Sequence, residues 1–240
     1  MSANQHLREL LAHRVPVEEQ RHITEVLDLR TRFLTVVVED LYQPHNAAAA
    51  IRACECFGIQ DLHAIATRQS WRVSEEVVAG ADQWVDVHTW DKPAAENTLV
   101  CLEMLKQRGF SILATSLRPG CIPLSEVPLD RPTALCFGTE KLGLSDLAHD
   151  LADGFVRIPM YGFTQSFNIS VSTALSLSAL SNRLRSSDQP WRLLPKDRHD
   201  LELRWLIRIS GLDQAALEQL AAQADYPLTE HHLAALKKSV

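Results

Sequence analysis

Residues 33–58 read FLTVVVEDLYQPHNAAAAIRACECFG and join the pattern of a strand to the pattern of a helix. The first seven residues, FLTVVVE, are largely apolar and β-branched, which predicts a buried strand over residues 33–39. Pro44 and Asn46 then predict the start of a helix, with Asn46 as its cap, that runs to Phe57 and stops at Gly58.

The same alternation continues through the middle of the chain. Short apolar runs predict strands over residues 61–66, 84–88, 110–115, 133–137 and 155–159, and helical patterns predict helices over 94–108, 145–151 and 168–185. The proline-rich residues 116–132 are expected to form a long surface connection. Because most of these strands are apolar throughout, the predicted fold is α/β, with a parallel sheet covered by helices on both faces.

Both ends of the chain have helical patterns. Leu7, Leu10 and Leu11 have helical spacing, and Pro16 is typical of the start of a second helix. Two further helices are predicted over residues 200–209 and 212–222, after a linker over 186–194. We therefore expect three parts, which are a short helical extension over 1–32, the α/β domain over 33–185 and a second short helical extension over 186–240.

Composition narrows the class of protein. The 240 residues contain no apolar run long enough to span a bilayer, and the N-terminal MSANQHLRELLAHR carries both charge signs, unlike a signal peptide. The five cysteines form no CxxC pair, and no HExxH occurs, so neither a disulfide framework nor a metal site is expected. We expect a cytoplasmic protein with no membrane or metal partner.

The nine glycines argue against the common nucleotide-binding loops. No two of them are separated by a single residue, so the GxGxxG fingerprint of a dinucleotide-binding turn is absent. Neither GxxxxGK[ST] nor GxSxG occurs, which argues against a P-loop enzyme and a hydrolase. A nucleotide-dependent oxidoreductase is disfavoured on the same ground.

Three clusters place polar side chains near predicted strand ends. In the first, PHNAAAAIR over residues 44–52, Asn46 lies six residues before Arg52 on an alanine-rich helix. The second, CFGTEKLGLS over residues 136–145, ends a buried strand in a turn with Glu140 between two glycines. The third, IPMYGFTQSFNISVS over residues 158–172, leads from a strand into a serine-rich helix. Ligands bind at the carboxyl ends of parallel strands, so the loop of the second cluster is well placed for a site.

Each cluster also has a purely structural explanation. Asn46 could cap its helix while Arg52 pairs with Glu55 or Glu39, and Glu140 could be a solvated residue of a tight turn. The third cluster could be a helix–sheet contact with Asn168 as the helix cap.

Taken together, the clusters resemble the three motifs of the SpoU family of the knotted SPOUT superfamily, in family order and with family spacing. The resemblance covers about residues 33–185 and is closest to the TrmH group, the tRNA (guanosine-18) 2′-O-methyltransferases. Phe167 stands where leucine is usual, and Thr164 where an aliphatic residue is usual. The matching positions are Asn46 and Arg52; Phe137, Gly138, Glu140, Gly143, Leu144 and Ser145; and Ile158, Pro159, Met160, Gly162, Ser166, Asn168, Ser170 and Val171.

The resemblance implies a deep C-terminal trefoil knot, in which residues 158–167 thread past the loop 138–143, with S-adenosylmethionine bound there and no metal. It also implies a homodimer, and the helices over 44–57 and 168–185, both rich in small residues, could pack across its interface. The residues expected to hold the cofactor are Thr115, Leu117, Gly138, Ile158, Met160 and Phe167.

The implied reaction is attack of an RNA ribose 2′-hydroxyl on the methyl group of S-adenosylmethionine. Arg52 is the central residue by resemblance, and because arginine keeps its proton we expect it to clamp the neighbouring phosphate and align the hydroxyl. Asn46, Glu140, Ser166 and Asn168 are expected to position the ribose and one another.

The distribution of charge predicts that RNA binds to the two flanks of the chain, residues 1–32 and 183–240. Residues 33–182 hold 10 Lys and Arg against 17 Asp and Glu, whereas the flanks hold 14 against 13. Open alternatives are that the flanks are ordinary solvated helices, that another tRNA or rRNA nucleotide is methylated, and that the chain is a binding module without the reaction. The expected RNA contacts are Arg8, Arg14, Arg21, Arg30, Arg32, Arg183, Arg185, Arg192, Arg198 and Arg204.

Overall fold

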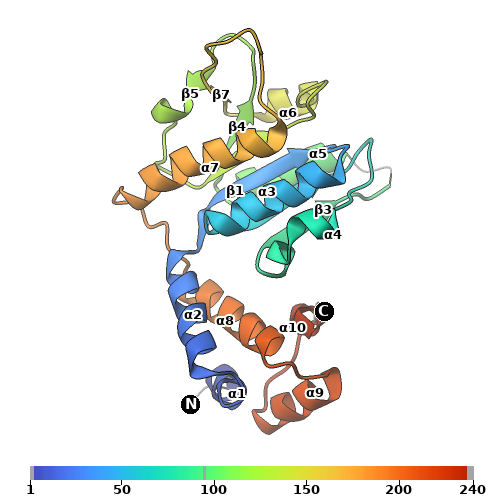
Figure 1. The fold of residues 1–240 in the computed structure, drawn as a ribbon, viewed down its shortest axis with the longest axis vertical. Coiled ribbons are helices and arrows are strands. Elements are labelled where there is room, and N and C mark those ends of the chain that lie inside the picture. The colour runs from blue at the N-terminus through green and yellow to red at the C-terminus, as the bar shows by residue number, and fades with distance from the viewer. Residues whose placement is uncertain (1–2, 94–95, 237–240) are drawn as a thin grey trace. The chain divides into compact units, whose positions relative to one another are not determined.

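The computed structural model of the protein describes residues 3–93 and 96–236. The larger of two compact units, residues 31–191, holds a seven-stranded sheet in the order β3-β2-β1-β6-β4-β7-β5, with every pairing between strands parallel (Figure 1). The predicted α/β class with a parallel sheet is confirmed. The strands are β1 (Thr31–Glu39), β2 (Ile59–Ile65), β3 (Asp86–Trp90), β4 (Ser111–Thr115), β5 (Ile122–Pro123), β6 (Thr133–Phe137) and β7 (Gly154–Arg157).

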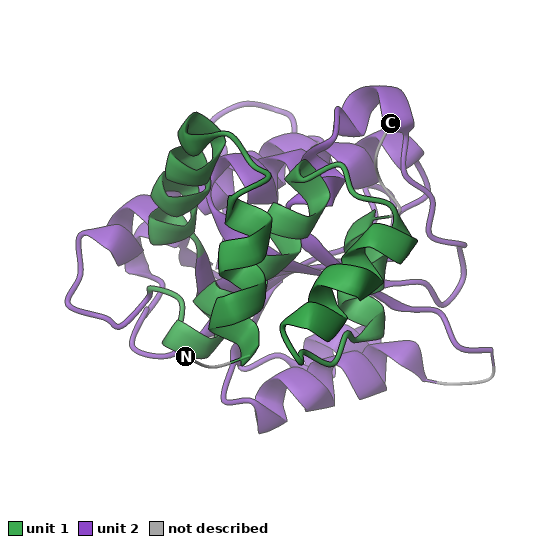
Figure 2. Ribbon diagram, turned by 90° about the horizontal axis from the view of Figure 1, so that it is seen from below, with its two compact units in different colours: residues 1–30, 192–240 green, residues 31–191 purple. Residues whose placement is uncertain are grey.

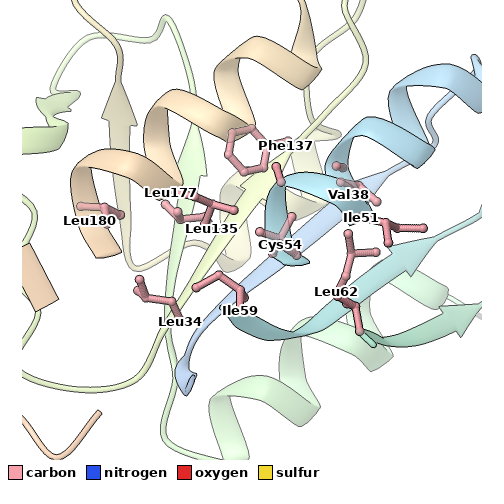
Figure 3. Close-up of a cluster of buried hydrophobic side chains, with 14 of the residues drawn as sticks. Leu34, Val38, Ile51, Cys54, Ile59, Leu62, Leu135, Phe137, Leu177 and Leu180 are labelled. Atoms are coloured by element: carbon pink, nitrogen blue, oxygen red, sulfur yellow. The ribbon is translucent and has the colours of Figure 1, made fainter. Parts of the chain in front are cut away.

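Helices cover both faces of the sheet. Leu34, Val36 and Val38 of β1 point to the face covered by α3 and α7, whereas Val37 points to the face covered by α5 and α6. Figure 3 shows part of the core on the first face, where side chains of the strands meet those of α3 and α7. The helices of this unit are α3 (Pro44–Cys56), α4 (Glu75–Val78), α5 (Asn97–Gln107), α6 (Asp146–Leu151) and α7 (Ile169–Arg185).

Helices α3 and α7 pack against each other within the chain (Figure 1). Ala47, Ala48 and Ala50 of α3 are buried, as are Thr173 and Ser176 of α7. Small side chains allow two helices to approach closely. The small residues of these helices therefore have an intrachain role, and packing of the same helices across a dimer stays a prediction.

The connection over residues 116–132 differs from the surface loop that its prolines predict. It contains strand β5 and a 3-10 turn, η2 (Leu124–Glu126). Leu124, Val127 and Leu129 are buried in the core on the α7 side. The loop prediction was wrong for this part because apolar side chains between the prolines fill the core beside α7.

Several element boundaries also differ from the predictions. The strand predicted over 61–66 begins two residues earlier and ends one residue earlier, at Ile59–Ile65, and the strand predicted over 84–88 lies two residues later, at Asp86–Trp90, because pairing with neighbouring strands sets their ends. The short helix α4 and a 3-10 turn, η1 (Ala81–Gln83), were not predicted. Ala94, the predicted first residue of the helix over 94–108, lies outside the described residues, and α5 is described from Asn97.

The second compact unit combines both ends of the chain, residues 1–30 and 192–240 (Figure 2). Helix α8 packs against α1, α2 and α10, and the guanidinium of Arg30 lies 5.3 Å from the ring centre of Trp205. Helix α8 begins at Pro195, earlier than predicted, because proline suits the first turn of a helix. The helices are α1 (Ala3–Ala12), α2 (Val17–Leu29), α8 (Pro195–Ile209), α9 (Gln214–Gln223) and α10 (Glu230–Leu236).

The three-part division at residues 32 and 185 stays a prediction, since the structure groups the residues before and after the sheet into one unit. Within the described part of the chain, none of the helices has both the length and the apolar character that crossing a membrane requires.

Candidate functional site

Three polar side chains from distant parts of the sequence meet after the carboxyl ends of β1, β6 and β7. The amide nitrogen of Asn168 donates hydrogen bonds to Oδ1 of Asn46, at 3.2 Å, and to Oε1 of Glu140. The amide nitrogen of Asn46 lies 3.4 Å from the same Glu140 oxygen and donates to it. One carboxylate oxygen is therefore held between two amides, and we call Asn46, Glu140 and Asn168 the polar triad.

The two asparagines of the polar triad are positioned in different ways. Helix α3 begins at Pro44 after Gln43 as its N-cap, so Asn46 lies in the first turn and does not cap the helix as predicted. Pro44 suits the first position of the helix, so the helix begins before Asn46 and the Asn46 side chain is available for other hydrogen bonds. Asn168 does cap α7, since its Oδ1 accepts a hydrogen bond from the backbone nitrogen of Ser170 at 2.9 Å. Capping uses the oxygen of Asn168 and leaves its amide nitrogen for the polar triad.

The loop that carries Glu140 is closed on itself. Thr139 and Gly143 exchange backbone hydrogen bonds of 3.0 and 2.9 Å. A Cβ atom at Gly138 would lie 2.1 Å from the carbonyl carbon of Gly143, so only glycine fits at this position. The closed loop therefore depends on the close approach of the backbone at Gly138 to the backbone at Gly143.

Glu39, at the end of β1, anchors the far end of the same loop. Its buried carboxylate accepts hydrogen bonds from the backbone nitrogen of Ser145 at 2.7 Å, the hydroxyl of Ser145 at 2.8 Å and the hydroxyl of Thr98 at 2.6 Å. Sequence reasoning considered Glu39 only as a partner of Arg52 and missed this role. The available signal was a carboxylate at the end of an otherwise apolar strand, where burial requires hydrogen-bond partners.

A cavity of about 450 Å³ lies along the loop after β7, within the size range of small-molecule sites. Three of the six predicted cofactor residues line it, namely Leu117, Ile158 and Met160. Of the others, Thr115 donates to the carbonyl oxygen of Cys136 at 2.8 Å, Gly138 lies in the closed loop, and Phe167 is exposed. That residues 158–170 thread through a loop stays a prediction.

Arg52 and Ser166 are not in the polar triad. Arg52 is exposed on α3 and donates to the carbonyl oxygen of Val77 at 3.0 Å. Ser166 is exposed in the loop before α7. The structure thus brings together three of the five predicted catalytic side chains.

The predicted RNA-binding arginines fall into three sets. Arg14, Arg21 and Arg192 are exposed, and Arg21 also forms an ion pair with Glu25 of the same helix at 3.6 Å. Arg30 is only 1% exposed, so we correct its assignment, because a buried guanidinium does not reach a phosphate. Six others have partners within their own compact unit: Arg8 with Glu202, Arg32 with Asp61 and Asp86, Arg183 with the Leu124 and Val127 carbonyls, Arg185 with the Phe57 carbonyl, Arg198 with Asp28, and Arg204 with Asp200.

A second polar cluster lies on the α5 side of β2 and β3. His63 stacks on His88 with ring centres 4.6 Å apart, and it accepts a hydrogen bond from the indole nitrogen of Trp90 at 3.3 Å. Burial, together with the neighbouring His88, lowers the pKa of His63 to about 3. Among the described residues, no group of three or more His, Cys, Asp or Glu side chains could hold a metal ion.

Comparison with known proteins agrees with this geometry. The model of the SpoU rRNA Methylase family matches residues 33–178. A protein of Borreliella burgdorferi named tRNA (guanosine(18)-2′-O)-methyltransferase is 39% identical over 188 residues, which cover 78% of this chain and 84% of that protein.

Solved structures agree as well. The A. aeolicus TrmH/SpoU tRNA modifying enzyme has a TM-score of 0.66 and 27% identity, with 86% of this chain and 96% of that chain covered. The SpoU methyltransferase AviRb from Streptomyces viridochromogenes, solved in complex with AdoMet, shares the fold at a TM-score of 0.57 and 21% identity, over 68% of this chain and 65% of that chain. From the family match over more than half of its length and the relative of B. burgdorferi, the chain belongs to the SpoU rRNA methylase family.

Proposed function

We propose that this chain is an RNA 2′-O-ribose methyltransferase that uses S-adenosylmethionine to methylate guanosine 18 of tRNA in the cytoplasm. The observation that carries the proposal is the polar triad, in which three motif side chains separated by up to 122 residues share hydrogen bonds beyond the strand ends. The name of the B. burgdorferi relative supports the choice of tRNA and of guanosine 18.

The cavity beside the loop after β7 is large enough for a small-molecule cofactor, and its lining is part apolar and part polar. Leu117, Ile158 and Met160 give it apolar walls, which suit an adenine ring. Thr115, Gly138 and Phe167 complete the set that we propose for the cofactor. The AdoMet complex of AviRb supports this choice of cofactor. When bound, S-adenosylmethionine supplies an activated methyl group.

The polar triad would orient the ribose. An amide offers both a donor and an acceptor, and Glu140 offers an acceptor that two amides already hold in place. Such preorganised groups align a hydroxyl without rearranging during the reaction. Ser166 is exposed in the same loop as Asn168 and would contact the ribose once RNA is bound.

Arg52 would act on RNA rather than on the cofactor. Its guanidinium is exposed, so it is accessible to a phosphate, and a planar guanidinium suits two-pronged phosphate binding. Because Arg52 is outside the polar triad, we propose that two copies of the chain form each active site. Tyr161, which is 98% exposed, Phe163 and Leu142 are exposed apolar side chains that a second copy of the chain would cover.

The test is methylation of unmodified tRNA by the purified chain with S-adenosylmethionine, followed by mapping of 2′-O-methyl nucleotides. We expect a single new modification at nucleotide 18. Modification at another tRNA nucleotide, or of rRNA alone, would replace the substrate in this proposal and keep the reaction. Thermal stabilisation by NAD and not by S-adenosylhomocysteine would remove the reaction as well.

A further inference from the structure

His149 of α6 joins the two segments that follow the last paired residues of β4 and β6. The pairing of β4 with β6 ends at Ala114 and Cys136, so the segments beyond these residues are no longer paired to each other, although Thr115 still pairs with β7 and Phe137 with β1. One segment carries Thr115 and Leu117, and the other carries the closed loop 138–143 and then Ser145. Side chains must fix the spacing of these two segments.

The imidazole of His149 bonds to both segments. Its Nδ1 lies 2.9 Å from the carbonyl oxygen of Ser145, and its Nε2 lies 3.2 Å from the hydroxyl of Ser116. A carbonyl only accepts, so Nδ1 donates to Ser145, which leaves Nε2 as the partner of the Ser116 hydroxyl. His149 is buried, and its ring packs on Phe155 with centres 5.8 Å apart, which fixes the ring orientation.

Ser116 and Ser145 are themselves held on their other sides. The backbone nitrogen of Ser116 donates to the carbonyl oxygen of Val156 in β7 at 3.1 Å, and the Ser116 hydroxyl accepts from the backbone nitrogen of Arg118 at 3.1 Å. Ser145 is bound to Glu39 at the end of β1. A continuous chain of hydrogen bonds thus runs from β1 through Ser145 and His149 to Ser116.

We propose that His149 is a positioning residue for the cofactor, which sets the position of residues 115–117 relative to the loop 138–145. The inference rests on the proposed function, because residues 115, 117 and 138 belong to the proposed cofactor site. His149 touches neither cofactor nor substrate in this scheme. It acts through Ser116, whose two neighbours in sequence are Thr115 and Leu117.

The test measures S-adenosylhomocysteine binding by calorimetry, without RNA. His149→Phe keeps a ring against Phe155 but removes both hydrogen bonds, and we expect binding about tenfold weaker. His149→Gln places an acceptor near the Nε2 position and should retain most of the affinity. His149→Asn reaches only the Nδ1 position and should bind as weakly as His149→Phe.

A matched control separates positioning from general stability. Ile112→Val removes one methylene from the same hydrophobic core, so it should lower the free energy of unfolding and leave the affinity for S-adenosylhomocysteine unchanged. Ser116→Ala should weaken binding as His149→Phe does, and the double variant should be no weaker than either alone. Ser116 is half-buried, so its variant carries the test if His149→Phe does not fold.

Amide hydrogen exchange supplies a second measurement that needs no ligand. In His149→Phe, the amides of residues 116–118 should exchange faster than in the wild type, whereas those of β1 should not. Suppose that folded His149→Phe binds S-adenosylhomocysteine as the wild type does and that its amides of residues 116–118 exchange at the wild-type rate. This result would overturn the inference and leave the proposed function intact. Absence of S-adenosylhomocysteine binding to the wild type would overturn both.

Discussion

Arg52 has the largest predicted effect on the reaction among the single side chains. Arg52→Ala should slow single-turnover methylation by roughly 10²-fold or more, because alignment of the hydroxyl is lost. Arg52→Lys should be almost as slow, since a point charge does not reproduce a planar contact. S-Adenosylhomocysteine affinity should stay unchanged in both, because Arg52 does not line the cavity.

The competing explanation of Arg52 is its hydrogen bond to the Val77 carbonyl. If that were its only role, Arg52→Ala would lower the free energy of unfolding by about 1 kcal/mol, and Arg52→Lys would keep normal turnover. Normal turnover in Arg52→Lys would therefore contradict the phosphate clamp.

His63 should make stability depend on pH. Its folded pKa, about 3, lies below the value near 6.5 in an unfolded chain, so the unfolded state binds the additional proton. The contribution of His63 to the free energy of unfolding is therefore fully present above about pH 6.5. It falls as pH decreases, by at most about 1.4 kcal/mol per pH unit. Urea unfolding between pH 7.5 and 4.5 measures this slope.

The control for this prediction is His63→Asn, which keeps an acceptor for the indole of Trp90 but does not titrate. Its free energy of unfolding should vary less with pH over the same interval. Equal slopes for the two proteins would show that another group controls the acid response.

Single residues also show where sequence reasoning succeeds and fails. Asn46, Glu140 and Asn168 could be predicted because family motifs mark them, although their mutual hydrogen bonds could not. Glu39 was missed because a carboxylate after an apolar strand is usually assumed to be solvated. Arg30 was predicted to be exposed because local pattern does not reveal Trp205, which lies 175 residues later and packs on it.

Among the loops and turns, the one after β6 should be the least tolerant of substitution. Gly138→Ala would place a carbon 2.1 Å from backbone, so we expect a loss of about 3 kcal/mol or more in unfolding free energy. Gly162→Ala is the control, since a Cβ there meets nothing within 4 Å. Thermal unfolding of both variants checks this, and equal stabilities would mean that the loop opens without penalty.

The sheet was predictable because most of its strands are apolar throughout, a pattern that is typical of buried parallel strands. Strand ends were less predictable, because pairing partners distant in sequence set them. The packing of Leu124, Val127 and Leu129 was not predictable from a segment rich in proline, since local composition does not show which apolar side chains meet α7.

For the chain as a whole, the structure changes how RNA binding should be tested. Deletion of residues 1–30 would expose the face of α8 that α1 and α2 cover, so it would disrupt the whole helical unit. Arg14→Ala and Arg192→Ala change exposed side chains only. Each should weaken tRNA binding and lower the slope of log K against log salt by about 1 for each phosphate that the arginine neutralises in the wild type.

Arg131→Ala is the matched control, since Arg131 is an exposed arginine of the sheet-containing unit outside the predicted RNA surface. Its tRNA affinity and salt slope should equal those of the wild type. Equal slopes for Arg14→Ala, Arg192→Ala and the wild type would place the RNA surface elsewhere on the chain.

Assembly of the helical unit from both ends of the chain imposes an order on events at the ribosome. Helices α1 and α2 leave the ribosome before α8, which packs against both of them and begins only at Pro195. At about 5–20 residues per second, the two early helices wait roughly 10 to 30 s for that partner. During this interval the sheet-containing unit can complete its own core. A nascent chain stalled before Pro195 should therefore present two unprotected amphipathic helices to chaperones and proteases.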